Sequence, residues 1–395
     1  MPGGGVKRWK TRYVTWRYCC TQCGNRFVPT AFRRYRALPR YGRGLISWCI
    51  YQLLIGGQNI NRVHRSLLDL FALPIPKTSV YLFKRAVAEY FRLGYENILA
   101  DLLSGKLINI DETAINLQKD KGYVWVLAST NSVYFFYRNS REGSFLADML
   151  QKFKGVLVSD FYTAYDSLDM PQQRCLIHLM RDMNEDLLKH PFDDELKSIA
   201  NMFSCLLKTI VDTIDRYGLR KRHLNKHRAH AARFCDWIIA RDFRSEVAKN
   251  YVRRVTKYRN HLFSFLAYDG IPWNNNNAEH AIKSFAKFRR FSNGTATEDT
   301  VSDYLVILSV CLTCEYRGLE FLKVLRGEMK GDFGFGPRRV TPLGLRPRRR
   351  EQTSLTGRKE ITVPKAGLGA IPTEGATFDK EYAKLRVITL NKFLP

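Results

Sequence analysis

Four segments decide the fold, and they read LINID at residues 107–111, YVWVLA at 123–128, VYFFYR at 133–138 and GVLVSD at 155–160. The first three are rich in β-branched and aromatic residues and are separated by polar turns, which predicts a three-strand meander. The fourth is apolar almost throughout, as expected for a strand that is buried on both faces. We therefore predict a β-sheet at the centre of the chain.

The segments between and after these strands complete the topology. Residues 145–153 have apolar side chains at helical spacing, and residues 173–178 resemble a further short strand. The order β-β-β-α-β-α-β predicts an α/β fold with a mixed sheet of the ribonuclease-H-like type, covered by helices. We expect the first part of this core over 104–180 and its final helices over 263–330.

Two carboxylates mark the ends of predicted strands. Asp111 closes the first strand and Asp160 ends the fourth, and the topology places them at one sheet edge. An unpaired carboxylate beside a core is costly unless a divalent cation bridges it, as in two-metal phosphoryl transfer. The Asn run at 274–277 predicts a helix start with a third carboxylate, Glu279, in its first turns. The alternative is that both Asp residues are ordinary turn residues at strand ends. Glu112, next to Asp111, is the residue that could substitute as a metal ligand.

Charge is unevenly distributed along the 395 residues, which carry a formal net charge of +27. Residues 1–68 contain 13 Lys and Arg and no acid, and residues 216–260 contain 14 Lys and Arg against three acids. The rest of the central region is neutral or acidic. This segregation indicates a polyanion that is bound at several places, and it argues against a uniformly basic ribosomal type of protein.

Compartment follows from what the sequence lacks. No apolar run reaches the roughly 18 residues of a membrane span, and the first residues have no apolar stretch typical of a secretory signal. The nine cysteines argue for a reducing compartment. We expect a soluble intracellular protein with no membrane partner.

The N-terminal segment 1–43 is basic and contains CTQCG at residues 20–24. Two cysteines at this spacing are typical of a zinc knuckle or ribbon, which needs four ligands. No second pair follows within ribbon distance. Cys20 and Cys23 are therefore either half of a Zn²⁺ site or part of a hairpin without metal. A second pair, Cys175 and His178, leaves the same two alternatives. It is either half of a metal site that has no matching pair in the sequence, or a buried thiol beside a histidine that only forms hydrogen bonds.

Three helices are predicted over 44–95. The first ends at Gly56, Asn59 caps the second, and the third begins near Thr78. Two helices joined by a short turn favour a helix-turn-helix DNA-binding domain, with an all-helical linker bundle as the alternative. In the third helix we expect the buried side to consist of Val80, Leu82, Phe83 and Val87. The side chains expected to face outward are Tyr81, Lys84 and Arg85.

The remaining regions are a basic helical insertion over 181–262 and a basic, mostly disordered tail over 331–395. Besides the third N-terminal helix, the insertion and the helix of Glu279 are predicted to contact DNA. The residues expected to do so are Tyr81, Lys84, Arg85, Arg220, Lys221, Arg222, Arg253, Arg254, Asn275, Asn276, His280, Lys283 and Lys287.

Four motifs together resemble a known family. DET at 111–113, SDFYTAY at 159–165, CLIHLMRD at 175–182 and NNNAEHAIK at 275–283 are similar to the signatures of IS66-type DDE transposases of bacterial and archaeal insertion sequences. The similarity spans about residues 15–328. It implies a catalytic triad of Asp111, Asp160 and Glu279 that binds two Mg²⁺ or Mn²⁺ ions. His280 departs from the Arg usual in the family, and the tail is not part of the pattern.

The resemblance implies a transposase that binds the ends of an insertion sequence, nicks DNA and joins the 3′-hydroxyl ends to target DNA. Its partners would be double-stranded DNA, further copies of the chain and helper proteins of the same element. It would act in the cytoplasm of a prokaryotic cell, associated with the nucleoid. The alternatives are a non-catalytic DNA-binding protein derived from a decayed or domesticated transposase, and a ribonuclease-H-like nuclease without strand joining.

Overall fold

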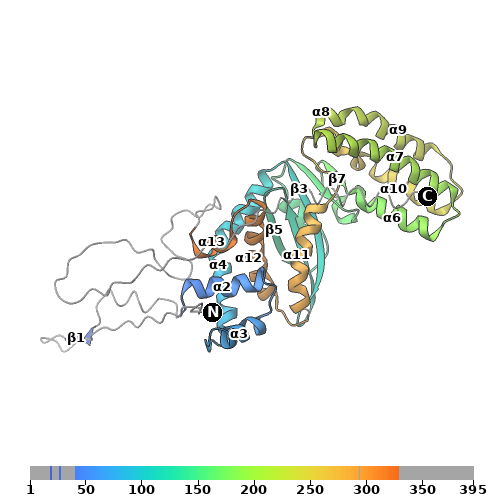
Figure 1. Ribbon diagram of the computed structural model, residues 1–395. Coiled ribbons are helices and arrows are strands. Elements are labelled where there is room, and N and C mark those ends of the chain that lie inside the picture. Colours follow the sequence, from blue (N-terminus) through green and yellow to red (C-terminus); the bar gives the residue numbers. More distant parts are fainter. Residues whose placement is uncertain (1–17, 20–25, 28–40, 293, 329–395) are drawn as a thin grey trace, which may run out of the picture. The chain divides into compact units, whose positions relative to one another are not determined.

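A computed structural model describes residues 18–19, 26–27, 41–292 and 294–328 (Figure 1). Its centre is a five-stranded mixed sheet in the order β5-β4-β3-β6-β7, which confirms the predicted α/β class. The strands are β3 (Leu107–Asn116), β4 (Lys121–Ala128), β5 (Val133–Arg138), β6 (Val156–Ser159) and β7 (Gln172–Arg174). β3, β4 and β5 are antiparallel, whereas β6 and β7 run parallel to β3.

β3 is longer than predicted and continues past Asp111 to Asn116. The prediction that Asp111 closes the strand is wrong, because β4 pairs with β3 along its whole second half, as far as Asn116 opposite Lys121. β6 pairs with β3 only as far as Asn109 opposite Val158. β3 therefore extends beyond the end of β6, and Asp111 lies on that extension.

Helices cover both faces of the sheet. Consecutive residues of a strand point to opposite faces, and Phe136 contacts Phe145 of α5 (Phe145–Met149), whereas Phe135 contacts Phe285 of α11 (Asn276–Ser292). α12 (Glu298–Tyr316) packs on β5 and on α4 (Lys77–Ser104). Ser309 and Thr313 of α12 accept backbone N–H groups of β5, so this sheet edge is covered.

The N-terminal helices are α2 (Arg43–Leu54), α3 (Ile60–Asp69) and α4, and α13 (Phe321–Arg326) contacts α2. Asn59 caps α3 as predicted, since its side chain accepts the Arg62 N–H at 2.8 Å. α4 is one continuous helix whose C-terminal half is buried in the same core as the sheet. Residue 95, where we expected a domain boundary, therefore lies inside a helix.

Two predictions for α4 are wrong. Leu82, expected inside, is 63% exposed, and Lys84, expected outside, is only 4% exposed. The face of α4 that carries Lys84 packs against α12, and the Lys84 ammonium donates to the Thr300 carbonyl at 2.7 Å. Tyr81 and Arg85 are exposed as expected.

Residues 176–267 form a helical block with its own core, which also includes Leu107, Val156 and Val158 of the sheet. The predicted strand over 173–178 is wrong beyond Arg174, because Leu176, Leu179 and Met183 have helical spacing and are buried on one side of α6. The elements are α6 (Leu176–Lys189), α7 (Asp194–Tyr217), α8 (Lys221–Leu224), η2 (Asn225–His227), α9 (Arg228–Ala240), α10 (Glu246–Leu262) and η3 (Ser264–Ala267).

Several predictions fall outside the described residues. They concern Cys20, Cys23 and the tail 331–395. Of residues 1–40 the structure describes only β1 (Tyr18–Cys19) and β2 (Arg26–Phe27), which pair antiparallel. Among the described helices, none is long and apolar enough to cross a membrane.

Candidate active site

The first two predicted catalytic residues lie at the same level on neighbouring strands. Asn109 of β3 pairs with Val158 of β6, so Asp111 and Asp160 are each two residues further along. Asp160 follows the last residue of β6 directly and its carboxylate accepts the Tyr162 N–H at 2.9 Å. Since both strands run in the same direction, the two side chains emerge at one point of the sheet.

The third residue, Glu279, is brought to this point by α11. An asparagine network fastens the start of α11 to β3: the Asn275 amide donates to the Ile110 carbonyl at 2.8 Å and accepts from Asn109 at 3.0 Å. The Asn277 side-chain amide donates to the side-chain oxygen Oδ1 of Asn109 at 3.3 Å. Glu279 lies in the first turn of α11, as predicted.

The three carboxylates interact electrostatically. Burial, together with the charges of Glu112, Asp160 and Glu279, raises the pKa of Asp111 to about 7, and the hydrogen bond from the Glu112 N–H opposes this rise. Like charges gathered at a half-buried position are unfavourable without a cation. Hard carboxylate oxygens are the ligands that Mg²⁺ prefers, so the donor set fits this ion.

Glu112, which we named as a substitute ligand, has other partners. Its carboxylate pairs with Arg141 at 2.6 Å and accepts the Tyr165 hydroxyl at 2.6 Å. Arg141 also stacks over the Tyr162 ring at 4.1 Å. Glu112 is therefore held in an ion pair beside the site, and its charge acts on Asp111.

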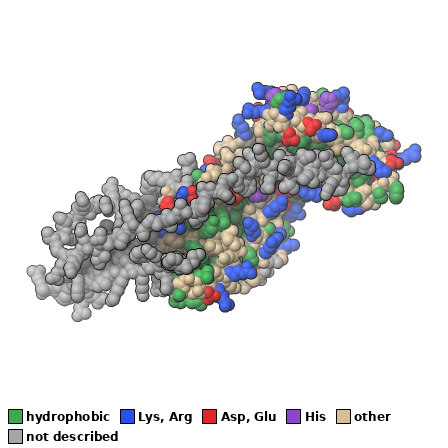
Figure 2. Space-filling view, viewed as in Figure 1, with side chains coloured by type: hydrophobic (Ala, Val, Ile, Leu, Met, Phe, Trp, Pro, Cys, Tyr) green, Lys and Arg blue, Asp and Glu red, His purple; other side chains and the backbone are tan. Residues whose placement is uncertain are grey.

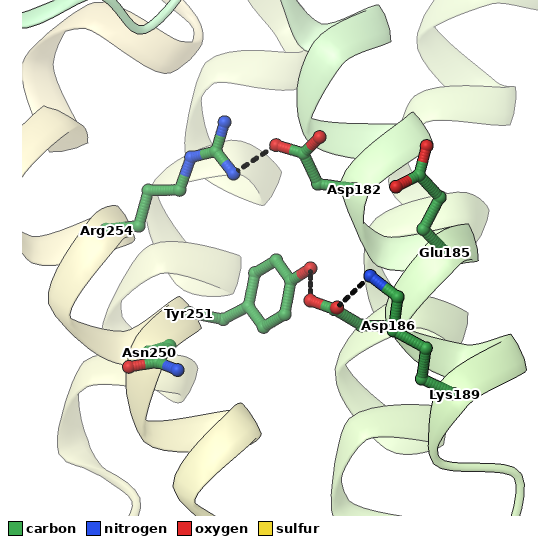
Figure 3. Close-up of a pocket in the computed structure, with 7 residues that line it drawn as sticks. All are labelled: Asp182, Glu185, Asp186, Lys189, Asn250, Tyr251 and Arg254. Carbon is green, nitrogen blue, oxygen red and sulfur yellow. Dashed lines mark hydrogen bonds and ion pairs between the residues drawn. The ribbon is translucent and has the colours of Figure 1, made fainter.

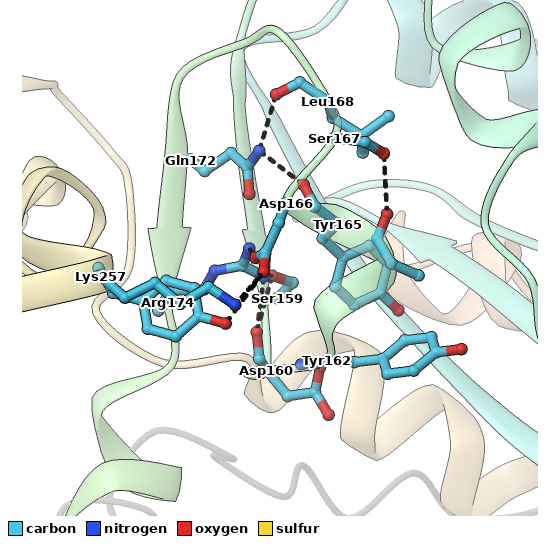
Figure 4. Close-up of polar contacts among 12 residues, drawn as sticks. Ser159, Asp160, Tyr162, Tyr165, Asp166, Ser167, Leu168, Gln172, Arg174 and Lys257 are labelled. Carbon is cyan, nitrogen blue, oxygen red and sulfur yellow. Dashed lines mark hydrogen bonds and ion pairs between the residues drawn. The ribbon is translucent and has the colours of Figure 1, made fainter. Parts of the chain in front are cut away.

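Arg174 is a residue of the site that sequence reasoning missed. Its guanidinium, 1% exposed, donates to the Ser159 hydroxyl at 2.7 Å and to the Asp160 carbonyl at 2.9 Å, and pairs with Asp166 at 2.5 Å (Figure 4). Asp166 is also bound by Lys257 of α10. Arg174 thus fixes the backbone that carries Asp160, and the available signal was an Arg in a short strand before the CLIHLMRD motif.

A second cluster adjoins Glu279. Cys175, His178 and Glu279 have ligand atoms that all lie within 4.8 Å of one another, and no other such group of three occurs in the described ranges. His178 Nδ1 lies 3.8 Å from Glu279 Oε1. Burial raises the pKa of the Cys175 thiol to about 11, and hydrogen bonds from the backbone N–H groups of His178, Asn275 and Ile177 oppose this rise.

A family model described as Transposase IS66 family matches residues 39–302, which include all of these site residues. The match covers most of the chain. The chain belongs to the IS66 transposase family. Membership makes it a DNA-processing enzyme of a family that acts in DNA transposition and binds DNA, and DDE transposases generally use divalent metal ions. No curated protein matches the sequence.

The IS66-family chain places its predicted DNA-contact residues unevenly. Arg220, Lys221, Arg222 and Arg253 are exposed on the insertion, and Asn276, His280, Lys283 and Lys287 are exposed on or beside α11. Figure 2 shows Lys and Arg side chains gathered on both regions. Asn275, in contrast, is fully buried in the network with β3, so the prediction that it contacts DNA is wrong.

Arg254 is engaged within the insertion. Its guanidinium pairs with Asp182 of α6 at 2.6 Å and stacks over the Phe161 ring at 3.7 Å. It lines a hollow between α6 and α10, in which Tyr251 donates to Asp186 at 2.8 Å (Figure 3). These pairs join the two helices of the transposase, and none of the residues that line the hollow belongs to the carboxylate site.

Proposed function

We propose that the protein is a DDE transposase that nicks DNA at the ends of its element and joins the 3′-hydroxyl ends to target DNA. Asp111, Asp160 and Glu279 are its catalytic residues and hold two Mg²⁺ ions. The observation that carries the proposal is the meeting of β3, β6 and α11, where three carboxylates are close enough for Asp160 and Glu279 to raise the pKa of Asp111. The strand order supports a ribonuclease-H-like core.

The donor set indicates the chemistry. Bound magnesium would activate the attacking oxygen and stabilise the leaving oxygen of an in-line displacement. The residues of the chain hold the carboxylates in place: Arg174 fixes the Asp160 backbone, and the Asn275 network fixes Glu279. Lys283 and Lys287 follow Glu279 on α11 and are exposed, which supports the proposal that they contact the phosphates of the cut strand.

End recognition is assigned in this proposal to the N-terminal part. α3 and α4 form the helix-turn-helix, with exposed Tyr81 and Arg85 contacting DNA. The chain acts as a homo-oligomer on double-stranded DNA.

The test is Mg²⁺-dependent cleavage of the DNA that flanks the gene. We expect Asp160→Asn to abolish cleavage while end binding stays intact, because the amide cannot replace a negatively charged metal ligand. Exposed Asp169, which lies on the same β6–β7 connection, supplies the control, and Asp169→Asn should cleave as the wild type does. Full cleavage by Asp160→Asn would rule out the triad.

A further inference from the structure

The cluster of Cys175, His178 and Glu279 combines three residues from two distant segments. Cys175 is the N-cap of α6 and His178 lies three residues later, so both point to the same side of the first turn. Glu279 comes from the first turn of α11. A tie between the segments, the Asn275 N–H donated to Cys175 Sγ at 3.3 Å, brings α11 against this turn.

The sulfur of Cys175 is surrounded by donors. The backbone N–H groups of Ile177, His178 and Asn275 all hydrogen-bond to it, and the residue is fully buried. Burial raises the pKa of this thiol, so it keeps its proton when no metal is bound. A coordinated metal ion removes that proton, and the three N–H groups would then each bond a charged sulfur. A thiolate is the form that binds a metal ion.

The other two ligand atoms lack partners. His178 Nδ1 and Glu279 Oε1 are buried atoms with no hydrogen bond, although they lie 3.8 Å apart. Buried polar atoms without a partner are rare, and an ion is one explanation for them. A separation of 3.8 Å is too long for a hydrogen bond. Two ligands of one tetrahedral ion with bonds of about 2 Å lie about 3.3 Å apart, so a small approach of the two side chains would let both bind one ion.

We infer that Cys175, His178 and Glu279 form a binding site for a thiophilic divalent cation, zinc above all. A mixed sulfur, nitrogen and oxygen set selects zinc over magnesium, which prefers oxygen ligands alone. Three protein ligands leave the fourth tetrahedral position for water. The site shares Glu279 with the proposed catalytic triad, so this ion would tie α6 of the insertion to the carboxylate site.

Co²⁺ reports on such a site without DNA or cleavage, because thiolate coordination produces a near-ultraviolet charge-transfer band and tetrahedral geometry produces strong visible bands. The full-length protein should carry Cys19→Ser, Cys20→Ser and Cys23→Ser, which removes the thiols of the N-terminal segment. We expect these bands to form in this background and to disappear when Zn²⁺ displaces Co²⁺.

Two further variants test the ligands. Cys175→Ser should abolish the charge-transfer band. The His178 side chain is partly exposed, so His178→Gln disturbs the fold less, and it should weaken Zn²⁺ binding by at least about tenfold. Cys205→Ser is the control, because this exposed thiol belongs to no cluster of the described residues and its loss should leave the bands unchanged.

The result also separates this site from the proposed catalysis. Asp160→Asn, which should abolish cleavage, should keep the Co²⁺ bands, because Asp160 is not one of the three ligands. Absence of the bands in the folded parent background, or bands that persist unchanged in both Cys175→Ser and His178→Gln, would overturn the inference. Folding of each variant is checked by circular dichroism and thermal melting.

Discussion

At the scale of single residues, Asp111 is a candidate metal ligand whose charge lowers the stability of the metal-free fold. Partial burial of its carboxyl group, together with the charges of Glu112, Asp160 and Glu279, raises its pKa to about 7. The pKa is higher in the folded than in the unfolded protein, so folding favours the protonated form. The stability that this group contributes at low pH is lost as pH rises from the unfolded value towards 7.

We therefore predict that Asp111→Asn stabilises the metal-free protein at pH 8, by on the order of 2 kcal/mol, because the amide carries no charge. The gain should fade near pH 4, where the wild-type carboxyl group is protonated in the folded state. Urea denaturation in the presence of a chelator at both pH values measures this. Mg²⁺ should stabilise the wild type more than the variant, and equal stability of both proteins at pH 8 would contradict the account.

At the scale of elements, hydrogen bonds of Asn275 hold the start of α11 against its neighbours. Asn275 makes two buried hydrogen bonds with β3, to Ile110 and Asn109, and its backbone N–H bonds Cys175 of α6. This one residue joins three elements, so the position of Glu279 depends on it more than on the helix propensity of α11.

We predict that Asn275→Ala lowers the free energy of unfolding by about 1–3 kcal/mol, because the Ile110 carbonyl and the Asn109 amide lose their buried partner. Asn276→Ala is the matched control: the neighbouring side chain is exposed, and its loss should change stability by less than about 0.5 kcal/mol. Urea denaturation of both variants gives the comparison. Similar losses in the two would show that the network does not hold α11.

At the scale of the whole molecule, the helical insertion has two candidate roles: its exposed basic residues could contact DNA, and its helices could support the neighbouring elements. Arg220, Lys221 and Arg222 are exposed around the start of α8, whereas Arg254 is paired with Asp182. The insertion could hold Glu279 near β3 and β6 without touching DNA, and then its charge would be an ordinary solvated surface. The salt dependence of DNA binding distinguishes these roles.

Each Lys or Arg that neutralises a phosphate contributes about −0.9 to the slope of log K against log salt concentration. If the insertion clamps DNA, replacing Arg220, Lys221 and Arg222 with Gln should make this slope shallower by about 2–3 units. Arg254→Gln should change it less, because that charge is already neutralised by Asp182. An unchanged slope for the triple variant, in a folded protein, would leave the insertion only its scaffold role.

The sequence alone was sufficient wherever a local pattern determines the structure. Strand periodicity located β5 and β6, Asn59 was recognised as a helix cap, and the Asn run placed Glu279 in a first helical turn. These features depend on the side-chain spacing and hydrogen bonding of neighbouring residues. Such information is present in any short stretch of the chain.

Only the tertiary structure could decide the features that depend on partners far along the chain. Lys84 is buried because α12, more than 200 residues later in the sequence, packs over it, and the Thr300 carbonyl accepts a hydrogen bond from its ammonium group. Asn275 is an anchor rather than a DNA contact because β3 accepts its bonds. Cys175 and His178 lacked a third ligand in the sequence, since Glu279 follows them only after the whole insertion. Tertiary packing brings these groups together, and the spacing of neighbouring residues in the sequence carries no information about such distant contacts.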